Sequence, residues 1–407
     1  MFVTELESAL DGRKFPADEL QTTHKDRPLW VRYDLEKIAS AVTKDELLNR
    51  PADIWRWREL LPVPKNARII TLNERTTRLI KTESLQKQIR HKNIWIKDES
   101  TLPTGSFKSR GMSMAITMAA HFGVKRIALP TAGNAGGAAA AYARQADIRC
   151  LVFMPEDTPA ANQYETISYG ASAFLVNGLI DDCSKIVGLA KEKLNCFDLS
   201  TLKEPYRIEG KKTMGLELAE QFNWKLPDVI LYPTGGGTGL IGMWKAFKEL
   251  RELGWLKSDI MPRMVAVQSD GCCPIVNAFK NGERFAKPFQ NAKTIAWGIR
   301  VPAAVGDFMI LDALKESNGT AVAVDEEMID DWTVMTSEKT GLSICPETAA
   351  CVGALENLKN QNWIHADDRV LIFNTASGQK YKDTVKVELP KININKEINW
   401  EIIEASL

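Results

Sequence analysis

The sequence predicts an α/β protein with two doubly wound domains, each built on a largely parallel sheet, and a ligand cleft between the domains. Short apolar runs alternate with amphipathic stretches from about residue 94 onward, which is the pattern of parallel strands joined by crossover helices. A break at 196–210 separates two groups of these runs. We expect strands at 93–97, 126–130, 149–154, 172–176, 228–232, 263–268, 320–324 and 369–373.

The same pattern predicts how the chain is divided. The expected helices between the strands include 135–145, 181–193, 211–222, 238–253 and 326–341. Residues 1–64 are charged and rich in Trp and Pro, and we expect an irregular N-terminal extension that docks on the body. Residues 65–108 together with 206–385 form the larger expected domain, residues 109–205 the smaller one, and residues 386–407 a C-terminal tail.

The composition argues against several classes of function. Lys+Arg and Asp+Glu both number 52 and no basic stripe is present, so neither nucleic acid nor an anionic membrane is an expected partner. The first residues carry acids where a signal peptide carries bases, and no apolar run approaches a membrane span, so we expect a cytoplasmic protein. The seven cysteines and four histidines are scattered, which predicts reduced thiols and no metal site.

Lys108 is the first candidate catalytic residue. It lies in the octapeptide Thr104-Gly-Ser-Phe-Lys-Ser-Arg-Gly111, directly before a segment with apolar residues at helical spacing. The unpaired N–H groups of a helix N-terminus disfavour added positive charge, and Arg110 contributes a second cation. Both effects lower the pKa of the lysine, as Schiff-base formation with a carbonyl cofactor requires. The alternative is a solvated lysine in the first turn of a helix.

A glycine-rich loop with a central asparagine follows the expected strand 126–130. Its sequence, Pro130-Thr-Ala-Gly-Asn-Ala-Gly-Gly137, leads directly into an expected helix. Glycines at such a turn expose backbone N–H groups that can surround an anion such as a carboxylate, and Asn134 adds a side-chain donor or acceptor. The alternative is a tight turn whose small residues serve helix packing.

A second glycine-rich loop, Pro233-Thr-Gly-Gly-Gly-Thr-Gly239, follows the expected strand 228–232. Four glycines in five residues let the backbone close around a phosphate at a helix N-terminus. The stretch Gly237-Thr-Gly-Leu-Ile-Gly242 also matches the dinucleotide fingerprint, with Asp270 as a candidate for the ribose. The loop therefore predicts phosphate binding, with dinucleotide binding as the alternative.

A fourth motif, Phe373-Asn-Thr-Ala-Ser-Gly378, places the hydroxyl of Thr375 or Ser377 just past a strand, at the sheet edge where α/β folds bind ligands. The four motifs together offer a lysine for a Schiff base, a loop for a phosphate, a loop for a carboxylate and a hydroxyl for a ring nitrogen. These are the groups that pyridoxal 5′-phosphate (PLP) and an amino-acid substrate require.

The chain resembles PLP enzymes of fold type II, the tryptophan-synthase-β-like class, and within that class the threonine synthases. The matching motifs run in order from about residue 55 to residue 385. Besides the lysine motif, the asparagine loop and Asn374-Thr375, they are Tyr206-Arg-Ile-Glu-Gly-Lys-Lys-Thr213, Thr294-Ile-Ala-Trp-Gly-Ile-Arg300 and Cys345-Pro-Glu-Thr-Ala-Ala350. The resemblance implies a lyase that converts O-phospho-L-homoserine and water to L-threonine and phosphate.

The resemblance also implies a role for each matching residue. Lys108 would carry PLP, Asn134 would bond its 3′-oxygen, and Thr375 would face its pyridine nitrogen. The cofactor phosphate would lie on Gly235, Gly236, Gly237, Thr238 and Gly239. The substrate carboxylate would be held by Thr131, Ala132, Gly133 and Ala135, and Arg207 resembles an arginine that binds the substrate phosphate.

Two loops differ from the usual threonine synthase pattern, and one of them favours a different enzyme of the same class. The phosphate loop Gly235-Gly-Gly-Thr-Gly is closer to the form found in dehydratases, so a threonine or serine dehydratase-like β-eliminase is the alternative. The asparagine loop, with Ala132 and Ala135, also lacks two hydroxyls that are usual in threonine synthases. The class commonly forms dimers, and the resemblance implies a homodimer acting on a small amino acid.

Overall fold

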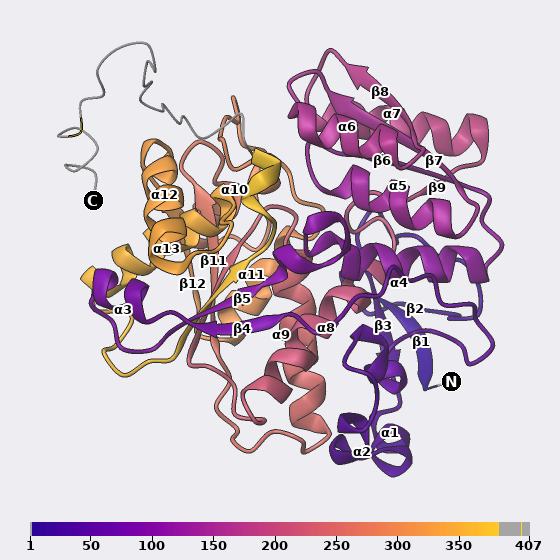
Figure 1. The fold of residues 1–407 in the computed structure, drawn as a ribbon. Coiled ribbons are helices and arrows are strands. Elements are labelled where there is room, and N and C mark those ends of the chain that lie inside the picture. Colours follow the sequence, from indigo (N-terminus) through magenta and orange to yellow (C-terminus); the bar gives the residue numbers. More distant parts are fainter. Residues whose placement is uncertain (1, 382–399, 401–407) are drawn as a thin grey trace.

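The computed structural model describes residues 2–381 and residue 400, and it contains three sheets surrounded by helices (Figure 1). All eight expected strands are present, and their ends differ from the expected ones by at most one residue. The α/β prediction is confirmed. The tail expected at 386–407 lies outside the described residues, apart from Trp400.

The largest sheet has six strands in the order β12-β11-β10-β13-β5-β4. All neighbours are parallel except β4, which runs antiparallel to β5 at the edge. The strands are β4 Arg78–Lys81, β5 Ile94–Asp98, β10 Val229–Pro233, β11 Arg263–Ser269, β12 Thr320–Val324 and β13 Val370–Asn374. The edge strand β4 was not predicted.

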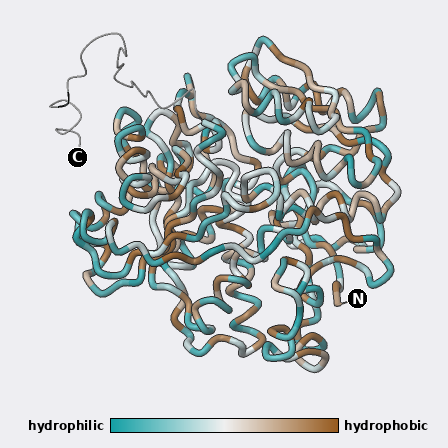
Figure 2. Tube along the Cα trace, in the orientation of Figure 1, coloured by the Kyte–Doolittle hydropathy of each residue, from teal (hydrophilic) through white to brown (hydrophobic). Residues whose placement is uncertain are grey.

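Helices cover both faces of the six-stranded sheet, because successive side chains of each strand point to opposite faces. In β10, Ile230 and Tyr232 pack in one apolar cluster with α8 and α9, whereas Val229 and Leu231 pack in another with α13. Figure 2 shows the resulting apolar trace through the sheet. The helices of this unit are α3 Glu83–Ile89, α8 Tyr206–Gln221, α9 Thr238–Glu252, α10 Pro274–Lys280, α11 Asp307–Glu316, α12 Ile329–Thr340 and α13 Pro346–Asn360.

The second sheet has four parallel strands in the order β8-β7-β6-β9. Helix α7 covers one face, where Ala128 packs near Val187, and α5 covers the other, where Ile127 and Leu129 pack near Ala138. The strands are β6 Arg126–Pro130, β7 Arg149–Pro155, β8 Ser172–Val176 and β9 Phe197–Asp198, and the helices are α4 Lys108–His121, α5 Ala135–Gln145, α6 Ala160–Ser168 and α7 Ile180–Leu194.

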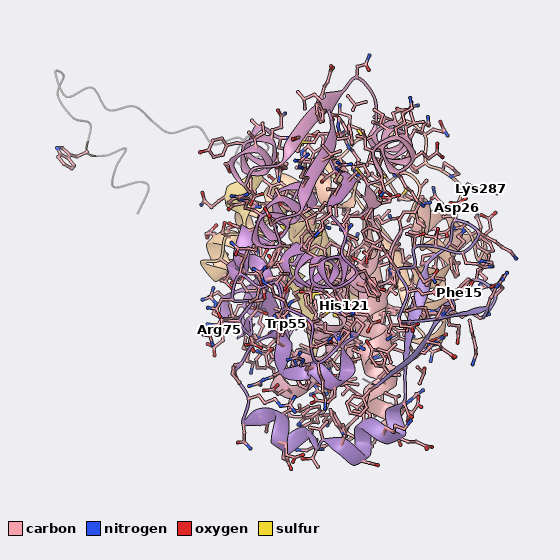
Figure 3. The ribbon with its side chains drawn as sticks, turned by 90° about the vertical axis from the view of Figure 1, so that its right-hand side faces the viewer. Phe15, Asp26, Trp55, Arg75, His121 and Lys287 are labelled. Carbon is pink, nitrogen blue, oxygen red and sulfur yellow. The ribbon has the colours of Figure 1, made fainter. Side chains whose placement is uncertain are left out.

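The N-terminal region is more regular than the sequence suggested, and the expectation of an irregular extension is wrong. It forms an antiparallel sheet in the order β2-β1-β3, with β1 Val3–Ser8, β2 Lys14–Phe15 and β3 Leu29–Tyr33. Helices α1 Leu35–Ala41 and α2 Lys44–Leu48 and the 3₁₀ helix η1 Ile54–Leu60 follow. These elements lie on the side turned toward the viewer in Figure 3, where Phe15, Asp26 and Trp55 are labelled.

The N-terminal region is held to the large unit by apolar and ionic contacts. Leu29 and Val31 of β3 are fully buried in the main core. Arg27 Nη1 donates to Asp307 Oδ1 at 2.8 Å, and the Tyr33 hydroxyl donates to Glu209 Oε2 at 2.7 Å. The region therefore packs as part of the body. None of the helices in the described part of the chain is long and apolar enough to cross a membrane.

Candidate active site

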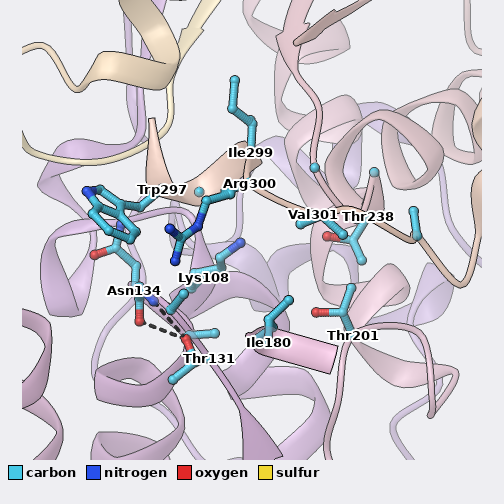
Figure 4. Close-up of a pocket in the computed structure, with 18 of the residues that line it drawn as sticks. Lys108, Thr131, Asn134, Ile180, Thr201, Thr238, Trp297, Ile299, Arg300 and Val301 are labelled. Atoms are coloured by element: carbon cyan, nitrogen blue, oxygen red, sulfur yellow. Dashed lines mark hydrogen bonds between the residues drawn. The ribbon is translucent and has the colours of Figure 1, made fainter. Parts of the chain in front are cut away.

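The strand-end loops of both large sheets meet around one cavity of about 310 Å³. Its wall includes the loops after β6, β10 and β13 and the first residue of α4 (Figure 4). The sequence motifs are therefore brought together at the carboxyl edges of parallel strands, where ligands of α/β folds bind.

Lys108 begins α4 and reaches into this cavity. The turn before it is tied to the segment after β13, since Phe107 N donates to Thr375 O at 2.9 Å and Ser377 N donates to Gly105 O at 2.9 Å. The amine lies 4.3 Å from the centre of the Phe107 ring. Burial, followed by the nearby charge of Arg207, lowers the pKa of Lys108 to about 7. The amine is thus substantially neutral near neutral pH.

Arg110 does not contribute to this shift as the sequence had suggested. Its guanidinium is fully buried and is paired with Glu99 Oε2 at 2.6 Å and with Glu217 Oε2 at 2.8 Å. Glu217 also accepts a hydrogen bond from the buried Lys97. Because two carboxylates compensate Arg110, its charge is not the cause of the low pKa of Lys108.

The asparagine loop closes on itself beside the lysine. Thr131 Oγ1 donates to Gly133 O at 2.9 Å and accepts from Gly133 N at 3.1 Å. Asn134 precedes α5; its Nδ2 donates to the Tyr381 hydroxyl at 3.1 Å, and its Oδ1 accepts from Asn162 Nδ2 at 3.0 Å. All five loop positions from 131 to 135 line the cavity.

The second glycine loop has no space for side chains. A Cβ at Gly235 would lie 2.8 Å from Gly298 O, and one at Gly236 would lie 2.7 Å from Thr201 Cγ2. Gly237 has a φ of +75°, which side chains disfavour. Residues 235–239 all line the cavity and lead into the 15-residue helix α9, so their backbone N–H groups are placed to receive an anion.

Thr375 lies on the cavity wall just after β13 and is 4% exposed. Its Oγ1 is 3.5 Å from Cys345 Sγ. Burial raises the pKa of Cys345 to about 12, so the thiol stays neutral. Thr375 and Cys345 therefore place a neutral hydroxyl and a neutral thiol side by side just after β13.

These groups fit PLP. The cavity combines a lysine that is largely neutral, a glycine loop that a Cβ would fill, and a neutral hydroxyl on the wall. A buried oxygen of the wall, Tyr232 Oη, has no hydrogen-bond partner among the described residues.

A family model for "Pyridoxal-phosphate dependent enzyme" matches residues 70–376. The chain belongs to this family. The chain is 33% identical to a threonine synthase of Methanocaldococcus jannaschii over 95% of this chain and 96% of that one. It is 32% identical to a threonine synthase of Methanosarcina acetivorans over 92% and 91% of the two chains. Among solved structures it is similar to maize serine racemase, with a TM-score of 0.65 and 22% identity over 74% of this chain and 88% of that one.

Membership of the PLP-dependent family leaves the dinucleotide alternative without support. Asp270, the candidate for a ribose, does not line the cavity, and its Oδ1 accepts from Glu326 N at 3.1 Å. The whole glycine loop instead faces the same cavity as Lys108.

Two residues of the cavity wall in this PLP-dependent enzyme, the acidic Glu347 and the aromatic Tyr381, were not predicted from the sequence. Glu347, in the first turn of α13, accepts from Gly298 N at 2.6 Å and from the Tyr381 hydroxyl at 2.9 Å. Its other oxygen, Oε2, is buried without a hydrogen-bond partner among the described residues, and its charge raises the pKa of Lys108 against the two larger effects. The motif that begins at Cys345 contained Glu347, but only the fold brings it to Lys108.

Arg207 lies behind the wall rather than on it. It is fully covered, its Nη1 donates to Leu199 O at 2.8 Å, and it is not among the residues that line the cavity. Its charge nevertheless acts on Lys108. The predicted contact between Arg207 and a substrate phosphate therefore stays a prediction.

Proposed function

We propose that the chain is a threonine synthase, which converts O-phospho-L-homoserine and water into L-threonine and phosphate. The observation that carries this proposal is the similarity to curated threonine synthases along more than nine tenths of both chains. The solved neighbour is less than 25% identical and supports the fold alone.

We assign the cofactor contacts to the residues that face the cavity. Lys108 would hold PLP covalently, Gly235–Gly239 would hold its phosphate, Asn134 would bond its 3′-oxygen, and Thr375 would face its ring nitrogen. PLP bound in this way withdraws electrons from the substrate carbon that carries the amino group. With the neutral hydroxyl of Thr375 at its nitrogen, the ring would be a milder electron sink than with a carboxylate, which would favour elimination and replacement over transamination.

Lys108 would also serve as the general base. Its amine, with a pKa of about 7, would take the proton from Cα of the substrate. The same amine would move protons at Cβ, where water adds, and at Cγ, from which phosphate leaves. The loop of Thr131, Ala132, Gly133, Asn134 and Ala135 would hold the carboxylate through the backbone N–H groups at the start of α5.

We also propose the finer organisation expected from the sequence. The separate six-stranded and four-stranded sheets support the division into residues 65–108 with 206–385 and residues 109–205. A homodimer is supported by exposed apolar side chains such as Tyr164, Ile167 and Phe174, and sedimentation of the protein would measure it. The balanced charge and the free, buried cysteines fit a reducing cytoplasm.

The decisive experiment is product analysis of the PLP-loaded protein with O-phospho-L-homoserine, with Lys108→Ala as the blank. We expect phosphate and threonine in equal amounts from the wild type and neither from the variant. A 2-oxo acid from threonine or serine, with no phosphate released from phosphohomoserine, would instead identify the dehydratase-like alternative.

A further inference from the structure

The cavity contains a cation that none of the assigned roles uses. Among the described residues that line it, the cations are Lys108, Lys203 and Arg300. Lys108 is assigned to the cofactor. Lys203 is more than a quarter exposed and lies 3.3 Å from Asp26 of the N-terminal region. Arg300 is therefore the buried cation still to be explained.

Arg300 is held in a fixed position. It ends the 3₁₀ helix η4 Trp297–Ile299, and its guanidinium carbon lies 4.1 Å from the centre of the Trp297 ring. Its side chain is only 9% exposed. Figure 4 shows its guanidinium entering the same pocket as the amine of Lys108. Stacking on Trp297 fixes the plane of the guanidinium, which prepares it to bind an anion through two parallel hydrogen bonds.

In this structure the anion is the carboxylate of Asp157, from the turn after β7. Arg300 Nη1 lies 2.8 Å from Asp157 Oδ2, and Nη2 lies 3.0 Å from Oδ1. The two partners differ in exposure, since the side chain of Asp157 is 51% exposed. Asp157 can return to water at little cost, whereas Arg300 without an anion would leave a mostly buried charge uncompensated.

The position of the Arg300 side chain argues against binding of the cofactor phosphate. The backbone of this segment lies against the glycine loop, where a Cβ at Gly235 would touch Ile299 and Val301. The Arg300 side chain, however, extends across to Asp157 on the unit of the four-stranded sheet. The glycine loop itself offers backbone N–H groups at the start of α9 for the cofactor.

We propose that Arg300 binds the phosphate of the amino-acid substrate and that Asp157 occupies this site until the substrate displaces it. This inference rests on the proposed function and names a substrate-binding residue for it. A phosphate presents the same paired oxygens as the carboxylate and carries more charge, so it competes effectively for the guanidinium.

The test compares three variants of the PLP-loaded protein. Arg300→Gln removes the cation, and Asp157→Asn removes only its resting partner. Glu165→Gln is the control. It breaks another ion pair between the two units, that of Glu165 Oε2 with Lys380 Nζ at 2.7 Å, and neither of these residues lines the cavity. O-phospho-L-serine and L-serine are titrated into each protein, and binding is read from the visible absorbance of the cofactor, so that no turnover is needed.

We expect Arg300→Gln to weaken binding of O-phospho-L-serine by roughly tenfold to hundredfold, as loss of charge-assisted hydrogen bonds predicts. Binding of L-serine should not change. Asp157→Asn should bind O-phospho-L-serine more tightly than the wild type, because the competing carboxylate is gone, and Glu165→Gln should behave as the wild type.

Three results would overturn the inference. If Asp157→Asn weakens binding as much as Arg300→Gln does, the pair only ties the two units together. If Arg300→Gln weakens binding of O-phospho-L-serine and of L-serine equally, Arg300 does not bind the substrate phosphate. If Arg300→Gln loses PLP itself, Arg300 binds the cofactor. The reaction is judged separately: a wild type that makes no threonine but shows Arg300-dependent binding of O-phospho-L-serine refutes the proposed function alone.

Discussion

Lys108 should react with PLP at a lower pH than an ordinary lysine. Only the neutral amine attacks an aldehyde, and burial together with Arg207 lowers the pKa of Lys108 from 10.5 to about 7. The neutral fraction is then about one tenth at pH 6 and about nine tenths at pH 8, whereas a lysine with the ordinary pKa stays below about 1% neutral over the same range. The rate of Schiff-base formation should rise between these two pH values and then level off.

Rapid mixing of the cofactor-free protein with PLP, followed by visible absorbance, measures this rate. PLP has ionisations of its own, so the same pH series with Nα-acetyl-lysine provides the correction. We expect the ratio of the two rates to fall steadily above pH 7, where Lys108 is already neutral while the free lysine continues to gain neutral amine. A ratio that is independent of pH up to pH 9 would refute the low pKa.

The same shift has a consequence for stability. Between pH 7 and pH 10.5, folded Lys108 binds fewer protons than unfolded Lys108. Lys108 therefore destabilises the folded protein most below pH 7, and this destabilisation disappears as the pH rises toward 10.5. The free energy of unfolding of the cofactor-free protein should gain about 1.4 kcal/mol per pH unit from this residue in that window. Urea unfolding of Lys108→Met should lack this contribution to the slope, and identical slopes would contradict it.

Three further predictions concern the framework of the site. Arg110→Met leaves two buried carboxylates partly uncompensated and should lower the free energy of unfolding by about 3 to 5 kcal/mol, measured in urea. Gly239→Ala places a methyl group against the Tyr232 hydroxyl and should weaken retention of PLP on gel filtration, while Gly188→Ala, where nothing lies within 4 Å, should not. Tyr33→Phe removes a hydrogen bond to a buried carboxylate and should lower the free energy of unfolding by about 2 kcal/mol, with PLP binding unchanged.

How much of the fold could be predicted depended on burial. The parallel strands are covered on both faces, so they form continuous apolar runs such as Val229–Pro233 that are easy to recognise. Four of the missed strands, β1 to β4, are antiparallel and partly solvated, and the fifth, β9, is a parallel strand of only two residues. Val3–Ser8 contains two glutamates, and Arg78–Lys81 lies at an edge with charged residues at both ends. Their pairing depends on partners elsewhere in the chain, which a local pattern does not reveal.

Some residues of the site could be predicted from the sequence and others could not. Lys108 and the glycine loops could be predicted because a turn and a helix start are encoded by neighbouring residues. Glu347 is held by Gly298 and Tyr381, which are distant in the sequence but belong to the same unit. The pair of Arg300 with Asp157, 143 residues apart, depends on how the two units meet across the cavity. Arg207 lies behind the cavity wall with Nη1 on the carbonyl of Leu199, and its predicted contact with the substrate phosphate stays a prediction.

Burial is the largest cause of the low pKa of Lys108, and whether a nearby cation adds to it depends on where compensating anions lie. Arg110 is two residues from the amine in sequence, yet its two carboxylates neutralise it. Arg207 is compensated by Glu204, whose own pKa is raised to about 7 by burial. Near neutral pH that carboxyl is ionised only in part, so Arg207 keeps much of its effect on the amine.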